Sequence, residues 1–200
     1  MTSDMKRVCV YCGSRAGNDP RFAAKAAEFG KRLAREQLTL VYGGGNVGVM
    51  GVIADAALAN GGEVIGVIPR QLVQWEVAHQ GLTRLDVVAS MHERKARMFD
   101  LSDAFVALPG GFGTLDEMFE MLTWRQLGFG DKPCALLDVD GFYSPLVGML
   151  DRMVERGFVP AGDRRDLWHG EDIDALLAWL RENQPMTTNA DPSTAREDTR

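Results

Sequence analysis

Cysteine, histidine and positive charge are all scarce in this sequence of 200 residues. Three cysteines do not make a disulfide framework, and no two of the three histidines (His79, His92 and His169) have the spacing of metal ligands. The formal net charge of -6 disfavours non-specific binding to nucleic acid, because a polyanion prefers a basic surface. These absences still allow a single nucleotide, which a small local site can hold.

Long apolar runs are also missing. No apolar stretch approaches the roughly 20 residues that are needed to span a bilayer. The sequence begins MTSDMKR and continues directly into a strand-like segment, without an apolar signal stretch. We therefore expect a cytoplasmic protein that has no membrane partner.

A CxxC motif, formed by Cys9 and Cys12, lies in the segment RVCVYCGS, which has the apolar pattern of a strand. A redox-active CxxC stands at the start of a helix, so a redox role is the weaker interpretation. Zinc is also disfavoured, because no second pair exists and Cys134 stands alone. We expect neither a metal ion nor a redox cofactor.

Apolar, β-branched runs alternate with helical patterns along the chain. The expected strands are 7–14, 38–44, 63–69, 82–90, 104–110 and 132–140, and the expected helices are 20–36, 48–62, 91–102, 114–128, 143–157 and 173–183. This alternation predicts an α/β fold in which helices cover both faces of a parallel sheet. The length favours one domain, residues 1–184, followed by a polar tail, 185–200, that we expect to be disordered.

In such folds ligands bind beyond the carboxyl ends of the strands. The segment GGGNVG follows the second expected strand there and fits the pattern G-x-G-x-x-G through Gly43, Gly44, Gly45 and Gly48. An NAD site would need an acid at the end of the next strand, where the sequence has a proline. A tight structural turn and a different phosphate or nucleotide contact both remain possible interpretations.

The segment LPGGFGTLDE follows the fifth expected strand. Gly110, Gly111 and Gly113 leave backbone N–H groups uncovered, and Thr114 adds a hydroxyl at the expected start of a helix. This pattern favours a phosphate cradle, although no lysine follows as in a Walker A loop. The alternative is a capping box, T-x-x-E, in which Glu117 reaches back to the helix start.

The segment MHERKARM places Arg94, Lys95 and Arg97 at the start of the helix that follows the fourth expected strand. Cations at this end oppose the helix dipole, which costs about 0.3–1 kcal/mol each when they are exposed. One interpretation is a solvated basic face. The other is an anion clamp, because clustered arginines suit bidentate contacts with phosphate.

Taken together, the segments VCVYCGS, VYGGGNVGVMG, MHERKARM and LPGGFGTLDE resemble the LONELY GUY family of cytokinin-activating phosphoribohydrolases, which were formerly labelled lysine decarboxylases. The resemblance runs from about Arg7 to beyond Asp140. It implies a doubly wound, Rossmann-like fold and a homodimer. The implied reaction is hydrolysis of N6-substituted adenosine 5′-monophosphates to the free base and ribose 5-phosphate. We see no context for a Schiff-base lysine, so we expect no pyridoxal phosphate and no other cofactor.

Carried onto this chain, the family pattern makes Arg94 and Glu117 the catalytic pair. The residues expected to bind the nucleotide are Gly13, Ser14, Glu76, Lys95, Arg97, Gly110, Gly111, Phe112, Gly113, Thr114 and Thr123. Two residues depart from the pattern: Arg15 stands where a small residue is frequent, and Asp116 where glutamate is frequent. Trp75, Met91, Met98 and Phe112 either line the base pocket or pack in the core.

Three other functions remain as alternatives to the hydrolase. The first is a non-catalytic carrier of a nucleotide or of molybdenum cofactor on the same scaffold. The second is an NAD-dependent oxidoreductase, and the third is a purely structural or interaction role. An assay for free base and ribose 5-phosphate separates the hydrolase from all three.

Overall fold

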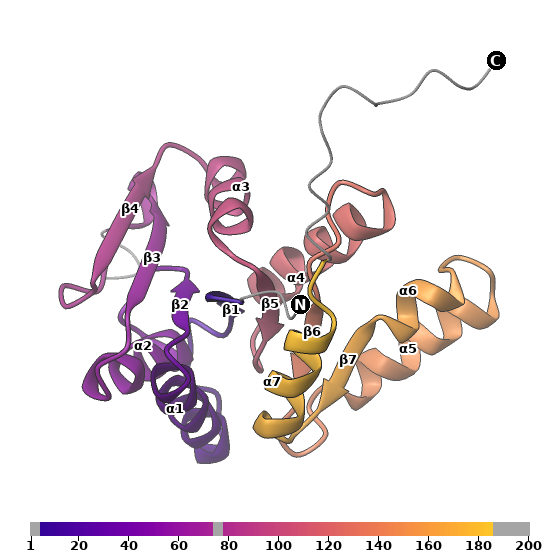
Figure 1. Cartoon of the computed structure of the whole chain (residues 1–200), viewed down its shortest axis with the longest axis horizontal. Helices are drawn as coiled ribbons and strands as arrows, with labels where there is room; N and C mark the ends of the chain where they lie inside the picture. Colours follow the sequence, from indigo (N-terminus) through magenta and orange to yellow (C-terminus); the bar gives the residue numbers. More distant parts are fainter. Residues whose placement is uncertain (1–4, 74–77, 186–200) are drawn as a thin grey trace.

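The computed structural model describes residues 5–73 and 78–185 (Figure 1). The strands are β1 (Arg7–Tyr11), β2 (Thr39–Tyr42), β3 (Val64–Pro69), β4 (Arg84–Val88), β5 (Ala104–Ala107), β6 (Cys134–Leu137) and β7 (Leu167–Gly170). The helices are α1 (Pro20–Arg35), α2 (Gly48–Ala59), α3 (Met91–Leu101), α4 (Phe112–Gln126), α5 (Ser144–Glu155), α6 (Ala161–Arg165) and α7 (Ile173–Glu182), with a short 3-10 helix at Arg70–Leu72. None of these helices is long and apolar enough to cross a membrane.

All seven strands form one parallel sheet in the order β4-β3-β2-β1-β5-β6-β7. The predicted parallel α/β sheet is therefore confirmed. Val8 of β1 pairs with Leu40 on one side and with Ala104 on the other. The strand order reverses between β1 and β5, and such a switch point leaves a crevice at the carboxyl ends of the strands.

Two layers of helices cover the sheet, as the doubly wound fold requires. Along β1, Val8 and Val10 point to the layer that contains α1, α2 and α7, whereas Cys9 and Tyr11 point to the layer of α3, α4 and α5. Both sets are buried. A strand buried on both faces reads as a continuous apolar run, which is why β1 was recognisable in the sequence.

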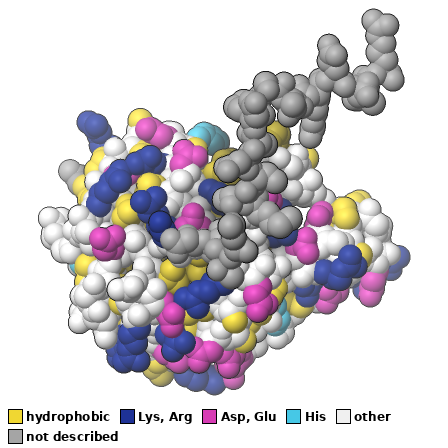
Figure 2. Space-filling model, in the orientation of Figure 1, with side chains coloured by type: hydrophobic (Ala, Val, Ile, Leu, Met, Phe, Trp, Pro, Cys, Tyr) yellow, Lys and Arg dark blue, Asp and Glu magenta, His cyan; other side chains and the backbone are white. Residues whose placement is uncertain are grey.

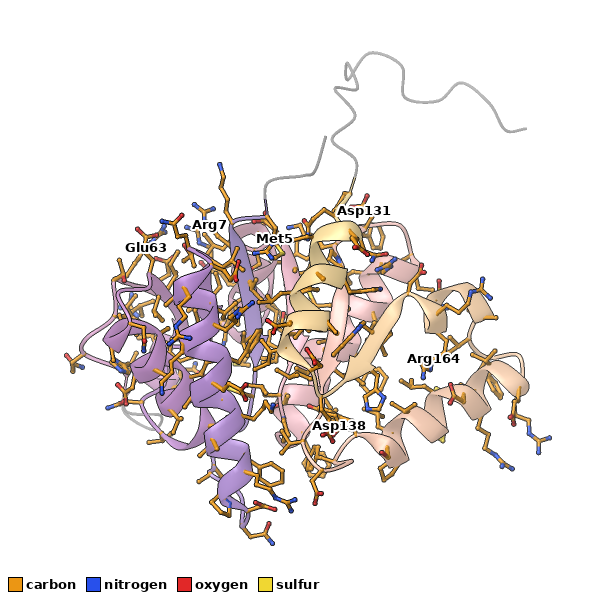
Figure 3. All side chains as sticks on the ribbon, turned by 60° about the horizontal axis from the view of Figure 1, so that its bottom comes forward. Met5, Arg7, Glu63, Asp131, Asp138 and Arg164 are labelled. Atoms are coloured by element: carbon orange, nitrogen blue, oxygen red, sulfur yellow. The ribbon has the colours of Figure 1, made fainter. Side chains whose placement is uncertain are left out.

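The amino ends and the carboxyl ends of the strands lie along opposite edges of the sheet and present different side chains. Figure 3 shows Arg7 and Glu63, at or just before the starts of β1 and β3, along one edge, and Asp138, directly after β6, at the opposite edge. This second edge is the carboxyl edge, where a ligand is expected. Over the face drawn in Figure 2, acidic and basic side chains are interspersed.

Three elements differ from the sequence-based expectation. The short helix α6 and the edge strand β7 were not predicted, because the β7 segment LWHG has neither a β-branched residue nor a continuous apolar run. Helix α4 begins at Phe112, two residues earlier than expected. Apart from Pro185, the proposed disordered tail lies outside the described residues, and so do two residues of interest, Trp75 and Glu76.

Candidate active site

A cleft of about 690 Å³ opens at the carboxyl ends of β1 and β5. This volume is in the range of small-molecule sites. Most of its walls come from segments that follow strands: the loop Cys12–Gly17 after β1, Gly43 after β2, the start of α3 after β4, and the segment from Pro109 into α4 after β5. The strand-end rule therefore located the cleft correctly.

The start of α4 presents its backbone to this cleft. Its N-cap is Gly111, and no side chain accepts a hydrogen bond from the first turn. The first N–H groups of a helix have no acceptor within the helix, and its dipole places partial positive charge there. Gly111 and Gly113 are exposed, and a Cβ atom at either position would meet nothing within 4 Å. The turn is thus open to an anion.

The capping-box interpretation of this segment is wrong. Thr114 is the third residue of α4 rather than its N-cap, and the helix has no side-chain cap. Thr114 and Glu117 are instead buried in the wall of the cleft, with only 4% and 7% of their surface exposed. Glu117 is therefore a carboxylate held beside the cleft, and not a helix-capping group.

Arg94 is placed by a capping box of its own helix. The Ser90 hydroxyl accepts a hydrogen bond from the Glu93 N–H, and the Glu93 carboxylate accepts one from the Ala89 N–H at 2.7 Å. These bonds fix the first turn of α3 and offset the cost of a cation there. Arg94 follows directly and points into the cleft, with 5% of its surface exposed.

The Arg94 guanidinium has few close partners for a buried cation. Its Nη2 atom lies 3.6 Å from Oε1 of Glu117 and donates a hydrogen bond to the Gly43 carbonyl at 3.4 Å. Its Nη1 atom lies 3.9 Å from the Met91 sulfur, and its Nε atom has no hydrogen-bond partner among the described residues. A buried charge normally satisfies all its donors, so this group is suited to receive a further acceptor from a ligand.

The loop after β1 connects the two glycine-rich segments. The Gly13 N–H donates to the Pro109 carbonyl at 3.2 Å, and the Gly13 carbonyl accepts from the Val49 N–H at 3.0 Å. Cys12 and Ser14 on either side of Gly13 line the cleft. Burial, together with the nearby charge of Glu117, raises the pKa of the Cys12 thiol well above its usual value. A raised pKa favours the protonated thiol over the reactive thiolate.

Three residues expected to bind the nucleotide lie outside the cleft of this chain. The Lys95 ammonium pairs with Asp116 at 3.2 Å and with Glu120 at 2.8 Å, and the hydrogen bond to Glu120 raises its pKa. Arg97 pairs with Asp86 at 2.9 Å, and the Thr123 hydroxyl donates to the Phe119 carbonyl at 2.7 Å. A direct contact between Lys95, Arg97 or Thr123 and a ligand remains a prediction.

The GGGNVG segment contributes only Gly43 to the cleft wall, as far as the described residues go. Gly44 and Gly48 have positive φ angles of 80° and 60°, a conformation that glycine adopts without strain. Glu63, the acid nearest to the NAD pattern, accepts a hydrogen bond from Thr39 at the opposite edge of the sheet. The NAD interpretation therefore lacks the acid that it requires at the end of β3, where Pro69 stands.

The apolar candidates for a base pocket separate into different environments. Met91 lines the cleft, whereas Met98 is fully buried in the core. Phe112 lies at the rim of the cleft with 94% of its surface exposed. Sequence reasoning missed Phe22 and Phe142, which contact each other edge to face at 5.7 Å and also line the cleft. The sequence could have indicated both residues, because each lies in the segment that follows a strand, β1 for Phe22 and β6 for Phe142.

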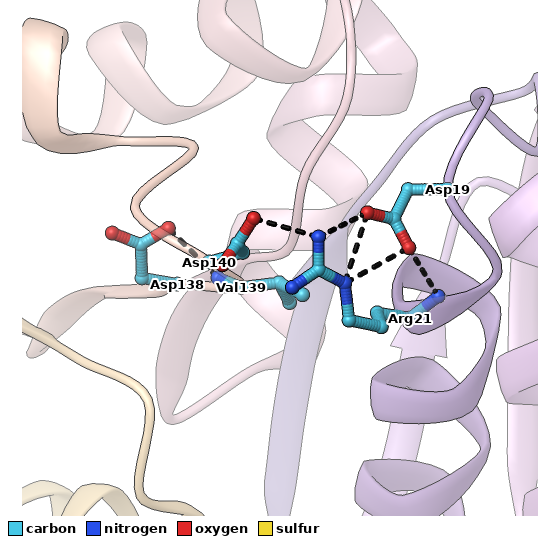
Figure 4. A network of polar contacts seen from close by, with 5 residues as sticks. All are labelled: Asp19, Arg21, Asp138, Val139 and Asp140. Atoms are coloured by element: carbon cyan, nitrogen blue, oxygen red, sulfur yellow. Dashed lines mark hydrogen bonds and ion pairs between the residues drawn. The ribbon is translucent and has the colours of Figure 1, made fainter.

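A polar network holds this aromatic end of the cleft together (Figure 4). The Arg21 guanidinium bridges Asp19, which caps α1, and Asp140, which follows β6, with 2.7 Å to Asp140. Behind it, Asp138 accepts hydrogen bonds from the Val139 and Tyr143 N–H groups. The network joins loops that lie more than a hundred residues apart in the sequence.

The fold and the cleft define the class: a Rossmann-like α/β protein with an exposed, glycine-rich helix start beside a buried arginine–glutamate pair. The family model described as "Possible lysine decarboxylase" matches residues 50–179. An Arabidopsis thaliana protein named cytokinin riboside 5′-monophosphate phosphoribohydrolase is 48% identical over 92% of this chain and 86% of its own length. A Rhodococcoides fascians protein of the same name is 45% identical over 88% and 89%. The chain belongs to this family, the LONELY GUY family that its motifs resemble.

Solved structures extend the likeness at the level of the fold. The molybdenum cofactor binding protein of Rippkaea orientalis has a TM-score of 0.68 and 22% identity, covering 90% of this chain and 98% of that one. The molybdenum cofactor carrier protein of Chlamydomonas reinhardtii has a TM-score of 0.65 and 21% identity, covering 89% and 97%. Identities this low show a shared fold and no more.

The decarboxylase description of the family model implies pyridoxal phosphate, and the cleft does not fit this cofactor. A pyridoxal phosphate enzyme holds the group through a lysine Schiff base. No lysine is among the described residues that line the cleft, and the nearby Lys95 is paired with Asp116 and Glu120. We therefore derive no step that uses the cofactor.

Proposed function

We propose that this protein hydrolyses the N-glycosidic bond of adenosine 5′-monophosphates, including N6-substituted ones, to the free base and ribose 5-phosphate. The observation that carries the proposal is the buried pair of Arg94 and Glu117, 3.6 Å apart, beside the open turn Gly110–Thr114. The names of the relatives at 42–48% identity support it.

In this proposal the phosphate binds the first turn of α4, where backbone N–H groups and the helix dipole attract an anion. The phosphate then anchors the ribose, so that its anomeric carbon faces Glu117, less than two helical turns further along α4. Holding the anomeric carbon next to Glu117 lowers the entropic cost of reaching the transition state. Gly13 and Ser14 line the same cleft and are proposed to contact the nucleotide from the opposite loop.

Bond cleavage develops positive charge on the sugar, as in other glycoside hydrolyses. The Glu117 carboxylate stabilises this charge, orients the attacking water and accepts the proton that the water releases. The water oxygen forms the new bond to the anomeric carbon. The electron pair of the broken bond leaves with the base, which takes up a proton from solvent. Arg94 either binds the phosphate or holds Glu117 in position.

The homodimer and the cytoplasmic location are also proposals. Phe112 and Phe129, near the two ends of α4, are exposed at 94% and 71%, and a second copy of the chain would cover such side chains. Lys95, Arg97 and Thr123 lie on α3 and α4 outside the cleft, so a second copy could bring them to a nucleotide. A cytoplasmic location suits a nucleotide substrate and three free, buried cysteines.

The test is base release from AMP and isopentenyl-AMP by the purified protein, followed by chromatography. Glu117→Gln should lower the rate by about 10²–10⁴-fold, the range of a general base, while AMP still binds in calorimetry. Glu155→Gln makes the same chemical change on the exposed surface of α5 and should leave the rate unchanged. Normal turnover in Glu117→Gln would remove this residue from the mechanism. Tight AMP retention without base release by the unmodified protein would favour the carrier.

A further inference from the structure

Gly43 lies directly against the guanidinium of Arg94. A Cβ atom built at Gly43 would overlap Nη2 of Arg94, and would lie 3.1 Å from the Met50 sulfur and 3.4 Å from the Arg94 Cζ atom. The φ angle of Gly43 is not positive, so its backbone conformation suits any residue. Glycine is therefore required at this position by the space that Arg94 occupies, and not by the turn.

The same nitrogen of Arg94 contacts both Gly43 and Glu117. Nη2 donates to the Gly43 carbonyl at 3.4 Å and faces Oε1 of Glu117 at 3.6 Å. Gly43 thus acts on Arg94 in two ways: its carbonyl accepts a hydrogen bond, and its missing side chain leaves room for the donor. A side chain at Gly43 would displace Nη2 from both partners at once.

We propose that Gly43 is a positioning residue, whose missing side chain lets Arg94 reach Glu117. This inference rests on the proposed hydrolase function of the same cleft. It gives the first glycine of GGGNVG a role in orienting a side chain 51 positions further along the chain, whereas the sequence pattern suggested contact with a phosphate.

Because the new Cβ atom at Gly43 would overlap a side chain and not the backbone, we expect Gly43→Ala to affect activity much more than stability. The atom that a new Cβ meets first is the far end of a long side chain, which can rotate away while β2 and its neighbours stay in place. Gly43→Ala should therefore cost little stability. The displaced guanidinium should lower activity sharply, because a misplacement of about 1 Å in an active site costs up to about 10²-fold in rate.

The experiment compares kcat, KM and melting temperature for the unmodified protein, Gly43→Ala, Arg94→Lys and the double variant, with AMP as substrate. Gly148→Ala is the matched control, since a Cβ at this exposed position of α5 meets nothing within 4 Å. We expect Gly43→Ala to lower kcat/KM by about 10²-fold, with a melting temperature close to that of the unmodified protein. In the Arg94→Lys background the same change should alter kcat/KM by less than about 2-fold, because the overlapping nitrogen is gone.

Three results would overturn the proposal: unchanged activity of Gly43→Ala, an equal loss in both backgrounds, or a variant that does not fold. The last result would mean that the backbone, and not Arg94, absorbs the overlap. If the unmodified protein releases no base, the proposed function fails instead. AMP dissociation constants of the same four proteins then test the positioning role, with the same non-additivity expected.

Discussion

The two glycine-rich segments at the carboxyl edge of the sheet look alike in sequence and differ in what surrounds them. In the first segment, Gly43, Gly44 and Gly48 face the protein itself. A Cβ atom at Gly48, for example, would fall within 3 Å of the backbone of the loop after β1. In Gly110–Gly113 the glycines Gly111 and Gly113 face open space. Gly44 and Gly48 are thus required by the fold, whereas Gly111 and Gly113 leave the backbone open to a ligand.

This difference teaches that the spacing of glycines does not identify a phosphate site. Both segments follow a strand and precede a helix, so both satisfy the local rule. The two segments differ in the atoms that a side chain at each glycine would meet. The two segments are nevertheless coupled, because Gly13 bonds to Pro109 on one side and to Val49 on the other. Substitutions of single glycines in each of the two segments test this difference.

The largest expected effect is loss of stability in Gly48→Ala. A side chain here combines a φ angle of 60° with an overlap against the backbone of Ser14 and Arg15. We expect the unfolding free energy to fall by about 2–5 kcal/mol, from backbone strain plus overpacking. Urea denaturation measures this loss. Gly61→Ala is the control, because Gly61 also has a positive φ angle, 76°, but a Cβ atom there meets nothing within 4 Å, so this variant reports the strain alone. Equal losses of unfolding free energy in Gly48→Ala and Gly61→Ala would show that the overlap at Gly48 contributes nothing.

Gly111→Ala should show the opposite behaviour. The new Cβ meets nothing, so the loss of stability should stay near the cost of alanine at an N-cap, about 1 kcal/mol or less. AMP affinity should fall by about 10- to 100-fold, because one charge-assisted hydrogen bond to the phosphate is weakened. Calorimetry measures the affinity. An unchanged dissociation constant would mean that the phosphate does not approach this turn.

A smaller effect is expected for Gly113→Ala, in the first turn of α4. Alanine favours the helix over glycine by about 0.5–1 kcal/mol, so the variant should be more stable by this amount. Gly148→Ala in α5 should gain similarly. Only Gly113→Ala should also lose AMP affinity. If both variants bind AMP equally well, the glycine at position 113 has no part in binding.

The smallest effect concerns Cys12, at the start of the loop between the two segments. Because burial raises the pKa of this thiol, iodoacetamide should not label it at pH 8 in the unmodified protein or in Gly111→Ala. Gly48→Ala, which pushes on the same loop, should label slowly. Mass spectrometry of the alkylated peptide measures the rate. Equal labelling in all three proteins would show that the loop is not coupled to Gly48.

Most of the fold follows from the sequence, because strands buried on both faces are visible as apolar runs. The edge strand β7 is the exception, since Leu167–Gly170 pairs only with β6 and lacks such a run. The place of the cleft also follows, from the rule that ligands bind at strand ends. These parts depend on local patterns that each segment carries by itself.

The roles of single residues at the site are harder to predict. The spacing T-x-x-E fits both a helix cap and a catalytic acid, and only the start of α4 at Phe112 decides against the cap. The partner of Gly43 lies 51 positions away, so no local pattern reveals it. The pairing of Arg94 with Glu117 came from family resemblance, and the fold supplies its physical cause.

The most direct measurement is a crystal structure of Glu117→Gln with AMP. We expect the phosphate oxygens to accept hydrogen bonds from N–H groups of residues 111–114, and the anomeric carbon to face the side chain at position 117. A phosphate bound instead along Gly43–Gly48, or a sugar turned away from position 117, would contradict it.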